Sequence, residues 1–251
     1  MSVLIYEKKG KIAYITLNRP EKMNAVNREL IDELAKTWVD FRDDDNLWVA
    51  VITGAGKAFC AGADFQSLSQ PGVQEEFNVA RENPNQYMVW KPIIGAINGH
   101  AIGRGLSIAL SCDIRIASEA AKFSMPEVRF NVMPQCVDIL ERALPPAIAR
   151  ELLLTGDSIT AQRAYEIGLV NKVVPPEQVL SEATATAERL CKNPPLAVRA
   201  MKDLLSRSRD LNYQTGAALY QNANARLRIS EDFAEGIKAF SEKREPTWKG
   251  R

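Results

Sequence analysis

Histidine is almost absent from this chain, and its cysteines are few and far apart. The 251 residues contain one histidine, His100, and no C-x-x-C pair. Zinc sites and redox dithiols need closely spaced thiol or imidazole ligands, so neither is expected. A histidine-dependent hydrolase triad would have to use His100, which follows Gly99 in a turn-like context without an adjacent acid. We expect no metal site, and buried, unreactive thiols at Cys60, Cys112, Cys136 and Cys191.

The chain also lacks long apolar runs and an excess of either charge. It has 32 Lys and Arg against 31 Asp and Glu, a net charge of +1. Such a balance gives no general attraction to nucleic acid or to an anionic membrane. No apolar run approaches the roughly 20 residues of a membrane-spanning helix, and residues 1–9 carry charge where a signal peptide would be apolar. We expect a cytoplasmic protein that binds neither nucleic acid nor membrane.

Strand-like and helix-like patterns alternate in the first part of the chain. Between the first two strand-like runs, Asn27 is a candidate N-cap, and apolar residues then recur at helical spacing from Leu30 to Phe41. Strand–helix–strand order of this kind predicts an α/β fold with crossover connections. The β-branched runs predicted as strands are 12–17, 49–53, 92–96 and 113–117, with 122–124 as a short edge strand.

The last third of the chain reads as helical. Leu180, Ala183, Ala187 and Leu190 indicate one amphipathic helix, after which Pro194-Pro195 interrupts the chain. An apolar stripe at Phe233, Ile237 and Phe240 indicates another. We therefore divide the chain into an α/β core, residues 1–193, and a helical region, residues 194–251, which would pack on the core or on another subunit.

Two glycine-rich segments, 54–65 and 99–107, have no phosphate-binding spacing. An ordinary tight turn is the simplest interpretation of each segment. The alternative is that their small residues expose main-chain N–H groups to a ligand. Two such donors would stabilise an enolate or a tetrahedral oxyanion, provided that a base lies nearby. Glu127 follows a strand end and a proline, where a side chain can be aimed rigidly, although exposed glutamates are common.

Several short segments, taken together, form a recognisable pattern along essentially the whole chain. They are Asn18-Arg19-Pro20, Lys22-Met23-Asn24-Ala25, Phe59 to Asp64, Asn98 to Gly105, Cys112-Asp113, Pro126-Glu127, Ala164 with Gly168-Leu169-Val170, and Glu235 to Arg244. In order and spacing these segments resemble those of the crotonase, or enoyl-CoA hydratase/isomerase, superfamily. The resemblance implies a crotonase-like spiral of ββα units closed by a C-terminal helical region, assembled as a homotrimer or as a hexamer formed by a dimer of trimers.

The same resemblance implies roles for particular residues. The main-chain N–H groups of Ala61 and Arg104 would hold the thioester oxygen, and Glu127 would transfer the proton. Coenzyme A would enter as part of the substrate, with no separate cofactor. The residues implied in substrate binding are Lys22, Met23 and Ala25 at the nucleotide end of CoA, Gly62, Ala63, Asp64 and Phe65 on the acyl side, Gly103 and Ser107 at the oxyanion loop, and Lys243 near the CoA phosphates of its own or an adjacent subunit.

Two departures from the family pattern bear on the reaction. Ser107 stands where hydratases of this family carry the first of two glutamates, and Gln135 stands where a dienoyl-CoA isomerase would carry aspartate. One carboxylate can move a proton between two carbons, so the favoured interpretation is an enoyl-CoA isomerase. The alternatives are a hydratase-like or C–C bond-forming or -breaking enzyme and, outside enzymes, an acyl-CoA- or RNA-binding protein.

Overall fold

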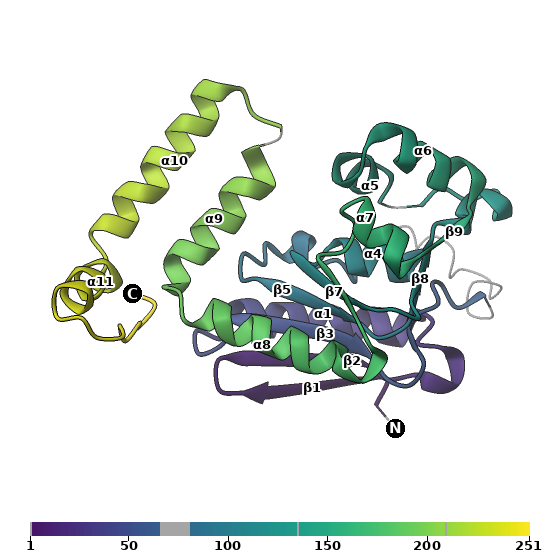
Figure 1. The fold of residues 1–251 in the computed structure, drawn as a ribbon, viewed down its shortest axis with the longest axis horizontal. Coiled ribbons are helices and arrows are strands. Elements are labelled where there is room, and N and C mark those ends of the chain that lie inside the picture. Colours follow the sequence, from purple (N-terminus) through teal and green to yellow (C-terminus); the bar gives the residue numbers. More distant parts are fainter. Residues whose placement is uncertain (1, 66–80, 135, 209) are drawn as a thin grey trace.

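The computed structural model describes residues 2–65, 81–134, 136–208 and 210–251. As the sequence predicts, strands alternate with helices through the first two thirds of the chain, and only helices follow from Pro195 onward (Figure 1). No described helix is long and apolar enough to cross a membrane. In the same residues, no group of three or more His, Cys, Asp or Glu side chains could hold a metal ion.

A six-stranded sheet forms the larger layer of the core. Its first pair is antiparallel and every other neighbouring pair is parallel. The four principal predicted strands are all present, within one residue at each end, whereas the first and last strands were not predicted. In spatial order the strands are β1 (Leu4–Lys9), β2 (Ile12–Leu17), β3 (Val49–Gly54), β5 (Ile93–Ile97), β7 (Ile114–Ser118) and β10 (Lys172–Val174).

Helices cover both faces of this sheet, which explains why its central strands are largely apolar. Successive side chains of a strand point to opposite faces. On β3, Ala50 and Ile52 therefore join the cluster that contains α1, whereas Val49 and Val51 join the cluster that contains α8. Figure 1 shows α8 in front of the sheet and α1 behind it.

Helix α1 (Arg28–Asp43) begins and ends where the sequence predicts. The Asn27 side chain accepts a hydrogen bond from the Leu30 N–H at 3.0 Å, which caps the helix N-terminus. At the other end, the Lys91 ammonium donates to the carbonyl oxygens of Phe41 and Asp44, each at 2.7 Å. A buried lysine thus satisfies carbonyl groups that the end of a helix leaves without partners.

A smaller, four-stranded sheet carries the turns that are of functional interest. Both glycine-rich segments contribute a short strand to it, instead of forming turns alone. The predicted edge strand 122–124 is internal, because a distant polar strand pairs along its outer side, and Phe123 is 1% exposed. The strands, in order, are β4 (Ala58–Cys60), β6 (His100–Ile102), β8 (Lys122–Ser124) and β9 (Ser158–Thr160).

The remaining helices connect the sheets and build the C-terminal region. The α-helices are α4 (Arg104–Leu110), α5 (Val137–Ala143), α6 (Pro146–Thr155), α7 (Ala161–Glu166), α8 (Val179–Cys191), α9 (Pro195–Ser208), α10 (Tyr213–Arg228) and α11 (Glu231–Ser241). The 3₁₀ helices are η1 (Pro20–Lys22), η2 (Pro84–Tyr87), η3 (Pro126–Phe130) and η4 (Pro176–Gln178).

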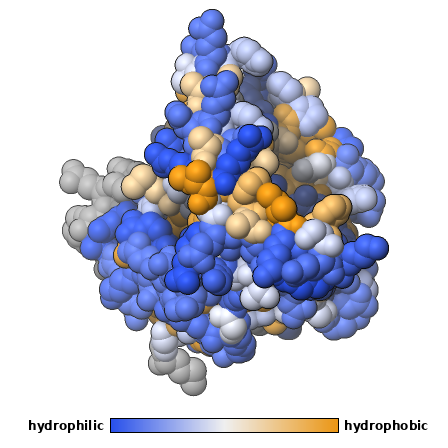
Figure 2. All heavy atoms as spheres, turned by 90° about the vertical axis from the view of Figure 1, so that its left-hand side faces the viewer, coloured by the Kyte–Doolittle hydropathy of each residue, from blue (hydrophilic) through white to orange (hydrophobic). Residues whose placement is uncertain are grey.

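The last three helices project from the core and expose apolar side chains. On α11 the predicted stripe is exposed: Phe233 by 44%, Ile237 by 58% and Phe240 by 88%. Figure 2 faces this side of the molecule and shows apolar side chains interrupting the hydrophilic surface across its middle. An apolar surface of this kind is typical of a contact with another chain.

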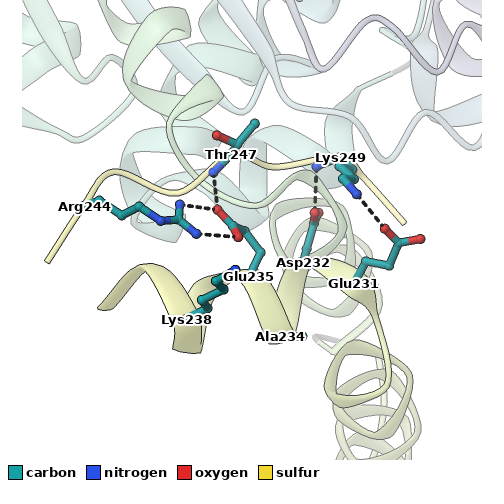
Figure 3. Close-up of a pocket in the computed structure, with 8 residues that line it drawn as sticks. All are labelled: Glu231, Asp232, Ala234, Glu235, Lys238, Arg244, Thr247 and Lys249. Carbon is teal, nitrogen blue, oxygen red and sulfur yellow. Dashed lines mark hydrogen bonds and ion pairs between the residues drawn. The ribbon is translucent and has the colours of Figure 1, made fainter. Parts of the chain in front are cut away.

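The C-terminal tail folds back along α11. Asp232, only 3% exposed, accepts hydrogen bonds from the N–H groups of Lys249 and Gly250 at 2.7 and 2.9 Å. Glu235 binds the Arg244 guanidinium through both oxygens, and Figure 3 shows these contacts lining a shallow pocket of about 500 Å³. The Trp248 indole donates to the Lys192 carbonyl at 2.7 Å, which ties the tail to the end of α8.

Candidate active site

Three main-chain segments meet at one edge of the smaller sheet. Strands β4, β6 and β8 are parallel neighbours, so the segments that follow them leave the sheet at the same edge. These are residues 61–65 after β4, residues 103–107 at the start of α4, and residues 125–130 after β8. The sheet therefore brings together the segments that carry most of the predicted site residues.

Glycines allow the first two segments to approach closely. A methyl group on Gly105 would lie 2.1 Å from the Cys60 carbonyl oxygen, and one on Gly62 would lie 3.0 Å from the Ile102 carbonyl oxygen. The same position on Gly62 is 3.8 Å from the Arg104 nitrogen, and Gly62 has a φ of +99°. Only glycine fits this backbone and this spacing. The main chain after Cys60 consequently faces the start of α4.

The structure does not support Ala61 as an oxyanion donor. Its N–H donates a hydrogen bond to the Met23 carbonyl oxygen at 3.0 Å and is therefore engaged within the protein. Ala63 forms a parallel bridge with Val26, in which the Val26 N–H donates to the Gly62 carbonyl and the Asp64 N–H donates to the Val26 carbonyl. In this pattern the Ala63 N–H points away from Val26. It has no acceptor among the described residues.

Arg104 begins α4 immediately after a left-handed residue. Gly103 has a φ of +53°, and its N–H donates to the Ser124 carbonyl at 2.9 Å. The Ser107 N–H donates to the Gly103 carbonyl at 3.0 Å and closes the first turn of the helix. These bonds fix the main chain on both sides of Arg104, in the first turn, where the N–H groups of a helix face outward along its axis.

The carboxyl group of Glu127 packs directly against this turn. A methyl group on Gly103 would lie 2.6 Å from Glu127 Oε1, while Oε2 is buried and has no hydrogen-bond partner in the described part of the chain. Burial raises the pKa of Glu127. A hydrogen bond from its own main chain and, to a smaller extent, the positive charge of Arg104 oppose this shift. A carboxyl group with a raised pKa beside main-chain donors is suited to proton transfer.

The Arg104 side chain turns into the protein, where it forms an ion pair that the sequence did not reveal. Its Nε lies 2.8 Å from Glu82 Oε1, and the two side chains are 8% and 2% exposed. Neither oxygen of Glu82 accepts a well-aligned hydrogen bond from the described residues. Burial raises the pKa of Glu82, and the Arg104 charge opposes that shift. Removing one partner of a buried pair typically costs about 3–5 kcal/mol of stability.

Ser107 lies beside a thiol. A side-chain hydrogen bond with Ser107 lowers the pKa of Cys136, but burial dominates and raises it to about 12. Cys60 and Cys112 are also buried, with pKa values raised to about 12, and Cys191 is half-buried. The thiols are thus predominantly protonated near neutral pH, as expected. Gln135, considered above as a replacement for an aspartate, lies outside the described residues.

The segment predicted to bind the nucleotide end of CoA is tied to residues 61–64. Arg19 pairs with Asp64 at 2.9 Å and donates to the Ala25 carbonyl. Buried Asn24 donates to the Ala55 and Ala58 carbonyl oxygens. Asp64, predicted to line the acyl side, therefore turns its carboxylate toward Arg19. The Asn18-Arg19-Pro20 motif was the available signal for this role of Arg19.

Apolar and basic side chains are among those that remain exposed around these segments. Met23 is 56% exposed, Phe65 is 58% exposed, and Lys22 is also at the surface. The Phe65 ring contacts the Phe130 ring, with centroids 5.0 Å apart. Phe130 lies three residues after Glu127, so this aromatic pair links two of the segments that form the site.

Lys243 is not near these segments within the chain. It is exposed and follows α11, with a φ of +53°. Figure 1 shows α11 on the opposite side of the large sheet from α4. The structure therefore brings Ala63, Gly103, Arg104, Ser107 and Glu127 together and leaves Lys243 apart.

A sequence model of the enoyl-CoA hydratase/isomerase family matches residues 7–251. The chain belongs to this family. It is 40% identical to an (E)-benzylidenesuccinyl-CoA hydratase of Thauera aromatica, over 97% of this chain and 98% of that one. It is 35% identical to a 2,3-dehydroadipyl-CoA hydratase of Escherichia coli over the full length of both chains.

Solved structures of this family have the same fold. An enoyl-CoA hydratase of Bacillus anthracis superposes with a TM-score of 0.94 at 33% identity, covering 99% of this chain and all of that one. An enoyl-CoA hydratase of Mycobacterium tuberculosis gives a TM-score of 0.92 at 35% identity over the full length of both chains. The crotonase-like fold expected from the sequence is confirmed.

The raised pKa of Glu127 leads to a prediction about stability. Below the pKa of the unfolded chain, Glu127 is protonated in both states and contributes no ionisation penalty. At higher pH the unfolded state releases the Glu127 proton more readily than the folded state does. The free energy of unfolding therefore falls as the pH rises through the raised folded-state pKa. Glu127→Gln removes this loss. We expect the melting temperature of the variant, relative to the parent, to be higher at pH 7 than at about pH 4.

Thermal unfolding of parent and variant at both pH values measures this difference. Glu151→Gln, at an exposed position on α6, serves as the matched control for loss of one carboxylate. A Glu127→Gln advantage that is the same at both pH values would contradict a raised pKa in the folded state.

Proposed function

We propose that this family member shifts the double bond of a 3-enoyl-CoA thioester to the conjugated position, with Glu127 as the proton-transferring group. The observation that carries the proposal is a carboxyl group of raised pKa packed against Gly103, combined with Ser107 where a second carboxylate would stand. Ser107 lies beside the protonated Cys136 thiol, and a neutral hydroxyl, which ionises only far above neutral pH, cannot replace a carboxylate as base.

The proposed reaction begins with the thioester oxygen held by the main-chain N–H groups of Ala63 and Arg104. Ala63 replaces Ala61 in this role because its N–H is directed away from Val26 and has no acceptor in the described chain. Ionised Glu127 removes a proton from C2, and the C–H electron pair moves into a dienolate whose negative charge rests on the thioester oxygen. Each main-chain donor contributes on the order of 3 kcal/mol to stabilising such an oxyanion.

Glu127 then returns the same proton to C4. The electron pair of the dienolate forms the new C4–H bond, and the double bond becomes conjugated with the thioester carbonyl. Because one proton leaves one carbon and enters another, one carboxylate suffices, and the reaction needs no cofactor beyond the coenzyme A of the substrate. In this proposal CoA lies along Lys22, Met23 and Ala25.

A second candidate function is hydration of a 2-enoyl-CoA thioester. The names of relatives favour it: the benzylidenesuccinyl-CoA and dehydroadipyl-CoA enzymes are both called hydratases. The absence of a carboxylate at Ser107 is the observation against it, since a water nucleophile then has Glu127 alone for activation. The two candidates predict opposite absorbance changes, because isomerisation creates the conjugated enoyl thioester and hydration removes it.

Glu127→Gln tests the proposed base. The amide keeps the size of the side chain but lacks basicity, so turnover of a 3-enoyl-CoA should fall by at least about 10², with little effect on binding of the thioester. Glu127→Asp should keep partial activity, because the base is displaced by about an ångström. The measurement is the rise in conjugated-thioester absorbance. Turnover by the Gln variant near the parent rate would show that Glu127 is not the base.

Ser107→Glu distinguishes the two candidate functions. The parent should hydrate crotonyl-CoA more slowly than a hydratase with two carboxylates. The difference should be roughly the 10²–10⁴-fold that a positioned acid–base group supplies. Placing a carboxylate at position 107 should increase hydration, whereas Ser107→Gln, of the same length but without a charge, should not. The loss of crotonyl-CoA absorbance measures both. Fast hydration by the parent would establish the hydratase alternative.

We also propose that the chain assembles through its C-terminal helices, as a trimer or a dimer of trimers, with Lys243 approaching CoA in a neighbouring copy. The exposed stripe on α11 supports this proposal. Light scattering at micromolar concentration should show a multimer that Phe240→Lys dissociates or weakens. Leu154→Lys, at a residue 73% exposed on α6, is the matched control. A parent that remains monomeric would contradict the proposal.

A further inference from the structure

The buried Glu82–Arg104 ion pair involves the first residue of α4, next to the Gly103 turn. Glu82 comes just before η2, and its carbonyl oxygen accepts a hydrogen bond from the Trp38 indole at 2.7 Å. Trp38 belongs to α1 and is itself 1% exposed in the core. Glu82 is therefore attached to a rigid part of the molecule, and its carboxylate reaches the Arg104 guanidinium at 2.8 Å.

Arg104 belongs both to this ion pair and to the proposed oxyanion site. Its main chain supplies a proposed oxyanion donor, and the preceding residue, Gly103, contacts the Glu127 carboxyl group. Its side-chain charge also acts on Glu127. A side chain that is 8% exposed and ion-paired cannot move freely, so the first turn of α4 is held from its side-chain end as well as by its backbone bonds.

We propose that Glu82 is a positioning residue of the active site, which acts through Arg104 to hold the first turn of α4 and to offset the positive charge that acts on Glu127. This inference rests on the proposed function, in which Glu127 is the base. Glu82 need not touch the substrate. It acts because opposite charges at 2.8 Å on two buried side chains interact strongly and their field reaches nearby groups.

The other ionisable groups near these side chains, in the part of the chain that the structure describes, include two thiols and the Tyr87 phenol, whose pKa burial and the Glu82 charge raise. Cys136, before α5, lies close enough to Glu127 for the carboxylate charge to raise its pKa. Cys60, at the end of β4, is likewise affected by Glu82 and Arg104, and also by Arg19. Burial raises the pKa of each thiol to about 12, so neither changes its charge in the range where a glutamate titrates.

Substitutions of the two partners should move the titration of Glu127 in opposite directions. Arg104→Gln keeps the main-chain N–H but removes the positive charge, so the acid limb of the kcat/KM profile should move to higher pH. Glu82→Gln leaves the Arg104 charge without this partner, so the limb should move to lower pH. In the Arg104→Gln background, Glu82→Gln should have no further effect, because a lone buried carboxyl group is already neutral. The acid limb of Arg104→Lys, which keeps the positive charge, should lie nearest to that of the parent.

Lys202→Gln is the matched control. Lys202 is also 8% exposed and ion-paired, to Asp113 at 2.8 Å, but it belongs to α9. Its loss should lower the melting temperature and leave the acid limb where it is. The ¹³C resonance of the Glu127 carboxyl carbon, assigned by its disappearance in Glu127→Gln, gives the same titration in folded protein without any turnover.

The outcomes separate this inference from the proposed function. Opposite shifts in the two single variants, with no further shift when Glu82→Gln is added to Arg104→Gln, would support the positioning role of Glu82. Shifts of the same sign, or none, in variants that still fold would overturn it, even if Glu127 proves to be the base. If Glu127→Gln retains full activity, the proposed function fails, and the carboxyl resonance still decides whether the pair controls the charge on Glu127.

Discussion

The close approach of two main-chain segments, one after β4 and one at the start of α4, is the constraint on which the candidate site depends. The carbonyl oxygen of Cys60 occupies the space that a side chain on residue 105 would need, and Gly62 also packs closely against the Ile102 carbonyl before α4. Main-chain donors can converge on one ligand atom only if no side chains separate them. The small sheet imposes this contact, because β4 and β6 are paired immediately before their chains enter the site.

The same close packing accounts for the electrostatics of the site. Excluding water from the Gly103 turn leaves one Glu127 oxygen buried without a partner and raises the pKa of its carboxyl group. It also encloses Glu82 and Arg104, which must then neutralise each other. Each of these arrangements reduces stability at neutral pH, and such costs are common where a protein holds groups ready for chemistry. Burial thus links the stability of this region to its reactivity.

The predictable part of the fold was the part with a periodic pattern. β2, β3, β5 and β7 are apolar runs covered on both faces by helices, and α1 has an N-cap and an apolar stripe, so each is recognisable from local sequence. The short strands of the small sheet are three residues long and include polar positions, as in Ser158–Thr160. Three residues cannot show a period. These strands form because distant segments pair, which also explains why residues 122–124 are internal instead of at an edge.

The sequence by itself determined which chemical groups are available: one carboxyl group at Glu127, a hydroxyl group at Ser107, small residues at 61–63, and glycines on both sides of Arg104. The tertiary structure alone decided how they are used. Ala61 and Ala63 are both alanines beside Gly62, and local sequence does not distinguish their N–H groups. The Ala61 N–H donates to the Met23 carbonyl, whereas pairing with Val26 leaves the Ala63 N–H pointing away from that strand. The partner of Arg104 is likewise 22 residues away in the chain. Hydrogen bonds and buried ion pairs depend on where separate segments meet, and local sequence does not encode that meeting.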